Sequence, residues 1–182
     1  MCLSVGYAHD ADKAYFNIIT EKKTTIIQAE FSWSIRNALI NYDYSFKNAK
    51  TEEDINLIFF NYIQDKLKLF NAEGKVLPLL KVILTKNPDH SHSTNYTLIF
   101  EGTDVVKISN LILLEHLQSQ QNYHTYSNPK GKETKFITNI QSPVFNLEIK
   151  KNSTPLIYYL IGGTIIIFVL LVLVYQLKKR KR

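Results

Sequence analysis

The sequence predicts an α+β fold: a mainly antiparallel, β-sandwich-like domain with two inserted helices, followed by one transmembrane helix near the carboxyl end. Three observations lead to this fold class. Short runs of β-branched and aromatic residues alternate with turn residues. The segment 51–66 has helical periodicity and a capping signal at its start. Residues 155–177 contain no Asp, Glu, Lys or Arg and are long enough to span a bilayer.

The sequence of the first part of the domain predicts a β-hairpin followed by a short helix. The runs 13–19 and 24–31 are rich in aromatic and β-branched residues and flank a charged turn at 21–23. Because a serine hydroxyl can accept a hydrogen bond from the first helical turn, we expect Ser32 to cap a helix over 34–41. The apolar side chains that we expect to cover the sheet from this helix are Trp33, Ile35, Leu39 and Ile40.

The second helix has the clearer signals. Thr51 is a good N-cap, and the three acidic residues that follow it favour the positive end of the helix dipole. The apolar residues repeat at helical spacing, and we expect this stripe to belong to the core: Ile55, Ile58, Phe59, Tyr62, Ile63 and Leu67.

Further strands are expected after this helix, at 67–70, 76–85, 96–100, 105–114, 136–140 and 144–149. Gly74 can take a positive φ in the first turn, and Pro78 indicates a sheet edge or a bulge because it cannot donate a ladder hydrogen bond. The polar segments 86–94 and 118–131 are expected to be loops.

The predicted membrane anchor, 155–177, begins at Pro155 and contains Gly162 and Gly163, and Tyr175 lies near its far end, where tyrosine prefers the membrane interface. The basic residues that follow predict a cytoplasmic carboxyl end at 178–182: Lys178, Lys179, Arg180, Lys181 and Arg182. The chain is therefore predicted to sit in the plasma (inner) membrane as a single-pass protein, with residues 9–150 outside, or periplasmic, and 151–154 as a linker. Residues 1–8 are interpreted as the end of a signal peptide, so that the mature chain would begin at His9.

Charge and cysteine content exclude several classes of protein. Five of the 22 Lys and Arg residues lie at 178–182, which leaves 17 against the 16 Asp and Glu residues, and a net charge of +1, for residues 1–154. A nearly neutral domain argues against nucleic-acid binding. Cys2 is the only cysteine, so an internal disulfide, a zinc ribbon and thiol catalysis are excluded.

Metal binding is the sharpest chemical hypothesis. His90 and His92 are two residues apart in a predicted loop, so both can point to one side of an extended segment, and imidazole suits nickel, copper and zinc. His9 would add an amine and an imidazole, and His124 lies in the other polar segment. Enzymatic activity is not predicted, because no Gly-x-Ser-x-Gly or His-Glu-x-x-His motif is present.

A non-catalytic binding role is the remaining interpretation. We predict an accessory domain that contacts the lipid bilayer through its anchor and binds a partner through polar loops, one of which contains Tyr123 and Tyr126. The span has no Gly-x-x-x-Gly pair, so homo-oligomerisation is not predicted. A type I adhesion or receptor-like surface protein is an alternative, because Asn95 and Asn152 each begin a glycosylation sequon.

Several segments together resemble the extracytoplasmic N-terminal domain that precedes the multi-span part of HupE/UreJ-type membrane proteins. The segments that carry this resemblance follow in order along 9–140: Ala8-His9, Ala14-Tyr15-Phe16, Phe31-Ser32-Trp33 with 36–39, Leu67-Lys68-Leu69, Glu73-Gly74, Pro78-Leu79, 96–100 and 114–126. That family is linked to nickel or cobalt uptake and to hydrogenase and urease maturation. The resemblance implies an exported accessory domain beside a separate multi-span membrane protein, and not transport itself, since only one span follows here. Domains of that family have an acidic, glycine-containing loop before the long helix. The corresponding loop here, 42–50, has too few carboxylates for a calcium site.

Overall fold

The computed structural model describes residues 11–85, 93–128 and 131–147. All of them belong to the first of two compact units, which covers residues 1–148. No helix within these described ranges is long and apolar enough to cross a membrane. The predicted signal-peptide end, linker, anchor and basic tail all lie outside the described residues. The elements are β1 Lys13–Glu21, β2 Thr24–Phe31, α1 Ser34–Tyr42, the 3₁₀ helix η1 Tyr44–Asn48, α2 Glu52–Lys66, β3 Leu67–Phe70, β4 Leu79–Thr85, β5 Thr94–Glu101, β6 Lys107–Asn110, β7 Gln121–Ser127, β8 Glu133–Thr138 and β9 Val144–Asn146.

The strands form a large sheet and a small one. The large sheet has six strands in the order β4-β5-β2-β1-β7-β8, and the small sheet has three in the order β3-β6-β9. Every neighbouring pair is antiparallel except β1 and β7, which run parallel. The predicted α+β class, with a mostly antiparallel sheet and two α-helices, is confirmed.

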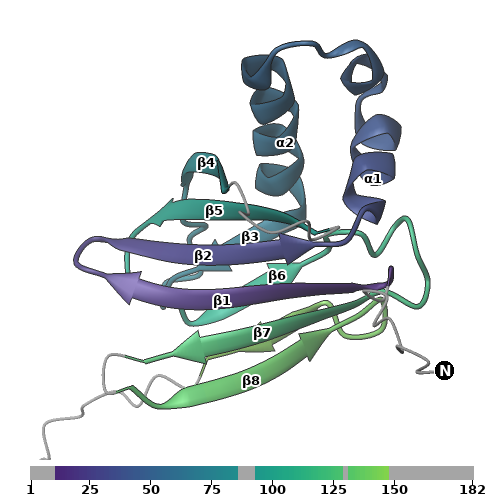
Figure 1. The fold of residues 1–182 in the computed structure, drawn as a ribbon. Helices are drawn as coiled ribbons and strands as arrows, with labels where there is room; N and C mark the ends of the chain where they lie inside the picture. Colours follow the sequence, from purple (N-terminus) through teal and green to yellow (C-terminus); the bar gives the residue numbers. More distant parts are fainter. Residues whose placement is uncertain (1–10, 86–92, 129–130, 148–182) are drawn as a thin grey trace, which may run out of the picture. The chain divides into compact units, whose positions relative to one another are not determined.

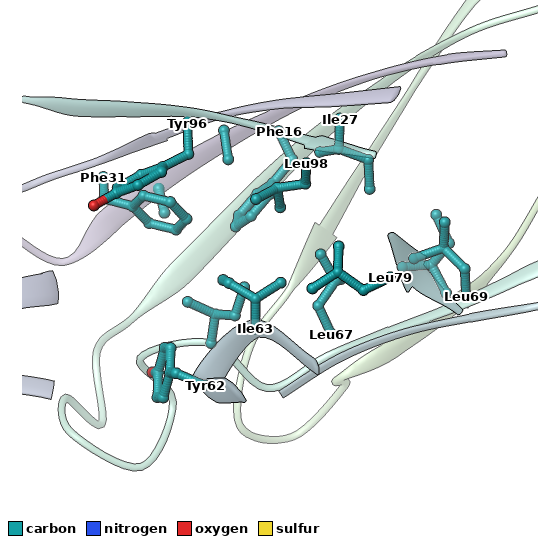
Figure 2. Packing of buried hydrophobic residues seen from close by; sticks show 14 of the residues in the cluster. Phe16, Ile27, Phe31, Tyr62, Ile63, Leu67, Leu69, Leu79, Tyr96 and Leu98 are labelled. Carbon is teal, nitrogen blue, oxygen red and sulfur yellow. The ribbon is translucent and has the colours of Figure 1, made fainter. Parts of the chain in front are cut away.

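The core lies between the inner face of the large sheet and a second layer made by the small sheet and α2. In Figure 1 the large sheet is in front, with β3 and β6 behind it, and α1 and α2 extend past its β5 side. Figure 2 shows Phe16, Ile27 and Leu98 of the large sheet facing Ile63 and Leu67. These five side chains are all at least 98% buried. One face of the large sheet therefore packs into the core.

Helix α2 forms where the sequence predicts it. The Thr51 hydroxyl accepts a hydrogen bond from the Asp54 backbone N–H at 3.1 Å, which caps the helix. Its buried stripe includes Phe59, whose ring stacks on Tyr96 of β5 with centroids 3.7 Å apart. Tyr62 is fully buried, and its hydroxyl accepts from the Leu113 backbone N–H at 3.0 Å. The apolar stripe of α2 is therefore core, as predicted.

Helix α1 also forms, but its start differs from the prediction. The residue at the N-cap is Trp33, which makes no side-chain cap hydrogen bond. Ser32 instead donates its hydroxyl to the backbone carbonyl of Ala11 at 2.8 Å. The prediction that Trp33 covers the sheet is wrong, because its side chain is 59% exposed while Ile35 and Leu39 are buried. The helix turns its 35/39 face inward, and Trp33, just outside the first turn, points to solvent.

Two boundary predictions in the second half of the chain are wrong. The polar composition of 118–131 predicts a loop, but the middle of this segment forms β7, which pairs with β1 and β8 inside the large sheet. The predicted strand 105–114 is shorter, since only Lys107–Asn110 forms β6. After β6 the chain turns, and Leu113 takes a left-handed φ of 64°.

The predicted turns and the sheet edge are confirmed. The β1–β2 hairpin turn places Lys22 at a positive φ of 47°, a conformation that residues with a Cβ rarely adopt. Gly74 has a φ of 79°, as its position in the β3 turn suggested. β4 is an edge strand with a register shift between Leu79 and Lys81, directly after Pro78.

Candidate binding site

The outer face of the large sheet contains a groove of about 400 Å³. The residues that line it come from five of the six strands of this sheet: Tyr15, Phe16, Asn17, Gln28, Ala29, Glu30, Thr85, Asn95, Tyr96, Thr97, Tyr123 and Thr125. Side chains alternate between the two faces of a strand, and Phe16, Ala29 and Tyr96 are buried on the core side. The groove is therefore built from the side chains of the opposite, outward face.

Sheet register places these outward side chains in two adjacent rows. The first row runs through Thr97, Gln28, Asn17 and Thr125, which are partners across β5, β2, β1 and β7. The second row runs through Thr85, Asn95, Glu30, Tyr15 and Tyr123, from β4 to β7. Side chains directly opposite each other on neighbouring strands are close enough to touch, so each row is a continuous surface.

An aromatic pair forms one wall of the groove. Tyr15 and Tyr123 are register partners on the parallel strands β1 and β7, and their rings stack with centroids 5.5 Å apart at an angle of 23°. The Tyr123 hydroxyl donates to the Gln121 side-chain carbonyl at 2.5 Å, which restrains the position of that ring. On the other side of Tyr15 lies β2, where Glu30 is its register partner.

The floor of the groove consists of amides and hydroxyls. Asn17 donates its side-chain amide to the Gln28 side-chain carbonyl at 3.3 Å, and the hydroxyls of Thr85 and Thr97 lie 3.4 Å apart. Glu30 supplies the one carboxylate among the described residues that line the groove. The lining is polar but carries little charge.

An apolar cluster adjoins the groove on the same face. Ile19, Ile26 and Ile99 are register partners on β1, β2 and β5, and Ile83 of β4 is 38% exposed nearby. Ile137 of β8, opposite Tyr123, is 51% exposed. Solvent-facing strand positions are usually polar, so isoleucine and tyrosine here distinguish this face from an ordinary solvated surface.

The core side of the sheet holds the groove's strands in place. Tyr96 and Phe16 stack against Phe59 and His124, with centroids 3.7 Å and 5.0 Å apart. Burial raises the pKa of Tyr96 to about 12, so that its hydroxyl stays neutral. Well-packed rings on one face leave the backbone little freedom to move the side chains on the other.

A second hollow, of about 520 Å³, lies on the helical side between Tyr42, Asp43, Asn61, Gln64, Asp65 and Lys68. Two of its polar side chains, Tyr42 and Asp43, already have structural partners. Hydrogen bonding to the Ser45 side chain and to the Ser45 backbone N–H, the latter at 2.9 Å, lowers the pKa of Asp43, and the Tyr42 hydroxyl donates to the Asn61 backbone carbonyl at 3.3 Å. This hollow is the weaker candidate.

The structure describes one of the four predicted metal ligands. His9, His90 and His92 lie outside the described residues. His124 is 2% exposed, and its Nε2 lies 3.1 Å from the hydroxyl of Thr138 inside the core. No group of three or more His, Cys, Asp or Glu residues in the described part of the chain could hold a metal ion. The loop position predicted for His124 is wrong, because β7 turns its side chain inward.

The pair His124 and Thr138 also has the composition of a base and a nucleophile. Both side chains are buried, Thr138 completely, so a substrate could not reach them. Burial also lowers the pKa of His124 to about 3, far below the range suited to a general base at neutral pH. We assign this pair to the core.

Comparison with family models and with curated proteins finds no match. The relationship to HupE/UreJ-type domains therefore stays a prediction. Sequence reasoning also missed the groove, because its residues come from segments that only the sheet brings together. The available signal was the outward set of strand positions, which holds Tyr15, Asn17 and Ile19 where charged residues are common.

Proposed function

We propose that the protein is a single-pass, membrane-anchored binding domain on the outer side of the membrane, and that it binds through the outer face of its large sheet. The observation that carries this proposal is the groove in that face, with its tyrosine wall, uncharged polar floor and adjoining isoleucines. Aromatic residues are enriched at binding surfaces because they bury much area with few rotatable bonds. The anchor at 155–177 supports the membrane location.

The partner that the resemblance suggests is a multi-span membrane protein, which the domain would assist without catalysing a reaction itself. The groove suits this role, because Glu30 is the one charged side chain among its described lining residues and a partner can cover it with few charges left buried and unpaired. Such a surface would be held near other membrane proteins by its own anchor.

Site-specific photo-crosslinking in intact membranes tests the binding surface. A photoreactive amino acid is placed at Gln28, in the groove, and in a separate protein at Gln64, which is exposed on α2. We expect adducts from position 28 and not from position 64, and their mass distinguishes a protein partner from a smaller ligand. Adducts from position 64 alone, or from neither position, would contradict the proposal.

The membrane topology needs its own measurement. Protease added to intact cells or spheroplasts should digest residues 9–150 and spare an epitope placed after Arg182. Digestion of the domain only after lysis would place it on the inner side and refute the proposed location.

A further inference from the structure

The groove has the hydrogen-bonding chemistry of a site for uncharged hydroxyls. Asn17 and Gln28 each offer a donor and an acceptor, Thr97 and Thr125 offer hydroxyls that can do either, and Glu30 offers two acceptor oxygens. These groups lie in two adjacent rows that cross the strands. A ligand with many hydroxyls along its length could satisfy both rows at once.

The tyrosine wall adds a flat apolar surface to this polar floor. One face of Tyr15 is covered by Tyr123, and the side chain remains 44% exposed. The face of an aromatic ring is electron-rich, so it attracts the slightly positive C–H bonds on the flat side of a sugar ring. A ring face beside amides and hydroxyls suits a pyranose, which has one C–H face and an edge of hydroxyls.

We infer that the groove binds an uncharged carbohydrate of about disaccharide size, an inference that rests on the proposed binding role of this face. The volume of about 400 Å³ falls within the range of roughly 300–1,000 Å³ found for small-molecule sites. Since the core packing beneath the groove fixes its strands, little ordering is needed when the ligand binds.

The same features disfavour other ligands. A carboxylate among uncharged groups repels an anionic ligand. An extended peptide gains its main-chain hydrogen bonds at a sheet edge, whereas the backbone groups beneath this groove are already paired within the sheet. A proline-rich segment inserts between separated aromatic rings, and Tyr15 and Tyr123 are in contact with each other.

Calorimetric titration of the full chain tests the inference, in a detergent without a sugar headgroup. The probes are maltose, cellobiose and N,N′-diacetylchitobiose, with digalacturonate as the charged comparison and decaproline as the peptide comparison. We expect a neutral disaccharide to bind, and Tyr15→Ala to weaken binding at least about tenfold, because it removes the stacking surface. Tyr15→Phe should keep most of the affinity. The matched control is Tyr44→Ala, which removes a 68% exposed tyrosine on η1 and should change nothing.

Three results would overturn the inference. These are no binding of any neutral disaccharide at millimolar concentrations, equal or tighter binding of digalacturonate or decaproline, or a Tyr15→Ala variant, folded by circular dichroism, that binds as well as the parent. Crosslinking from position 28 shows whether such a result overturns only the carbohydrate inference or also the proposed function. Position-specific adducts without saccharide binding mean that the ligand class is wrong and the face still binds. If adducts are also missing, the proposed function fails as well.

Discussion

The buried histidine of β7 makes the stability of the domain sensitive to acid. The His124 ring stacks on Phe16, lies 4.6 Å from the Phe145 ring, and places Nε2 3.1 Å from the Thr138 hydroxyl. None of these contacts supplies a negative charge. Burial therefore disfavours the protonated ring and lowers the pKa of His124 to about 3 from the 6.5 of an exposed histidine.

The magnitude follows from the difference between the folded and unfolded pKa values. Between about pH 6.5 and about pH 3 the unfolded chain binds a proton at His124 that the folded chain does not bind. The free energy of unfolding thus falls as the pH falls, by up to about 1.4 kcal/mol per pH unit. From pH 7 to pH 5 the loss from this one residue is about 2 kcal/mol. Above about pH 7.5 His124 adds little pH dependence, because the unfolded chain then carries almost no proton there.

Urea unfolding of the full chain, followed by circular dichroism between pH 7 and pH 5, measures this loss. His124→Gln keeps a hydrogen-bonding side chain near Thr138 but cannot titrate. From pH 7 to pH 5 its free energy of unfolding should therefore fall by about 2 kcal/mol less than that of the parent. Parallel pH curves for the parent and His124→Gln would refute the reasoning, whatever their stabilities at pH 7.

Substitutions at three further positions test local features by the same urea unfolding. Thr51→Ala removes the hydroxyl that caps α2 at the Asp54 N–H and should cost about 1 kcal/mol, whereas Thr51→Ser should cost little. Tyr62→Phe leaves the buried Leu113 N–H without its acceptor and should cost about 1–3 kcal/mol. Lys22→Asn should stabilise the protein by up to about 1 kcal/mol, because asparagine tolerates the positive φ of the hairpin turn better than lysine does. Equal stability of Thr51→Ala and Thr51→Ser, an unchanged Tyr62→Phe, or a destabilised Lys22→Asn would contradict the respective assignment.

Local patterns in the sequence determined the elements whose signals are short-range. The Thr51 cap with the acidic first turn, the turn glycine at Gly74 and the edge signal at Pro78 each depend on neighbouring residues and match the structure. The prediction of an anchor at 155–177 also uses only the hydrophobicity of consecutive residues, and it stays a prediction because this segment lies outside the described residues. The cap, the turn glycine and the edge signal were therefore predictable without knowledge of the fold.

Tertiary structure alone decided the features that depend on distant partners. β7 is polar in sequence, yet two of its polar side chains are buried with hydrogen-bond partners. The Asn122 amide donates to the Ile112 carbonyl at 3.0 Å, and Nε2 of His124 lies 3.1 Å from the Thr138 hydroxyl. Only pairing with β1 and β8 makes this segment a strand, and the same pairing brings Tyr123 against Tyr15 to form the groove wall. The physical reason is that a buried polar side chain is acceptable once it has a hydrogen-bond partner, and these partners come from other segments, 10 and 14 residues away in the sequence.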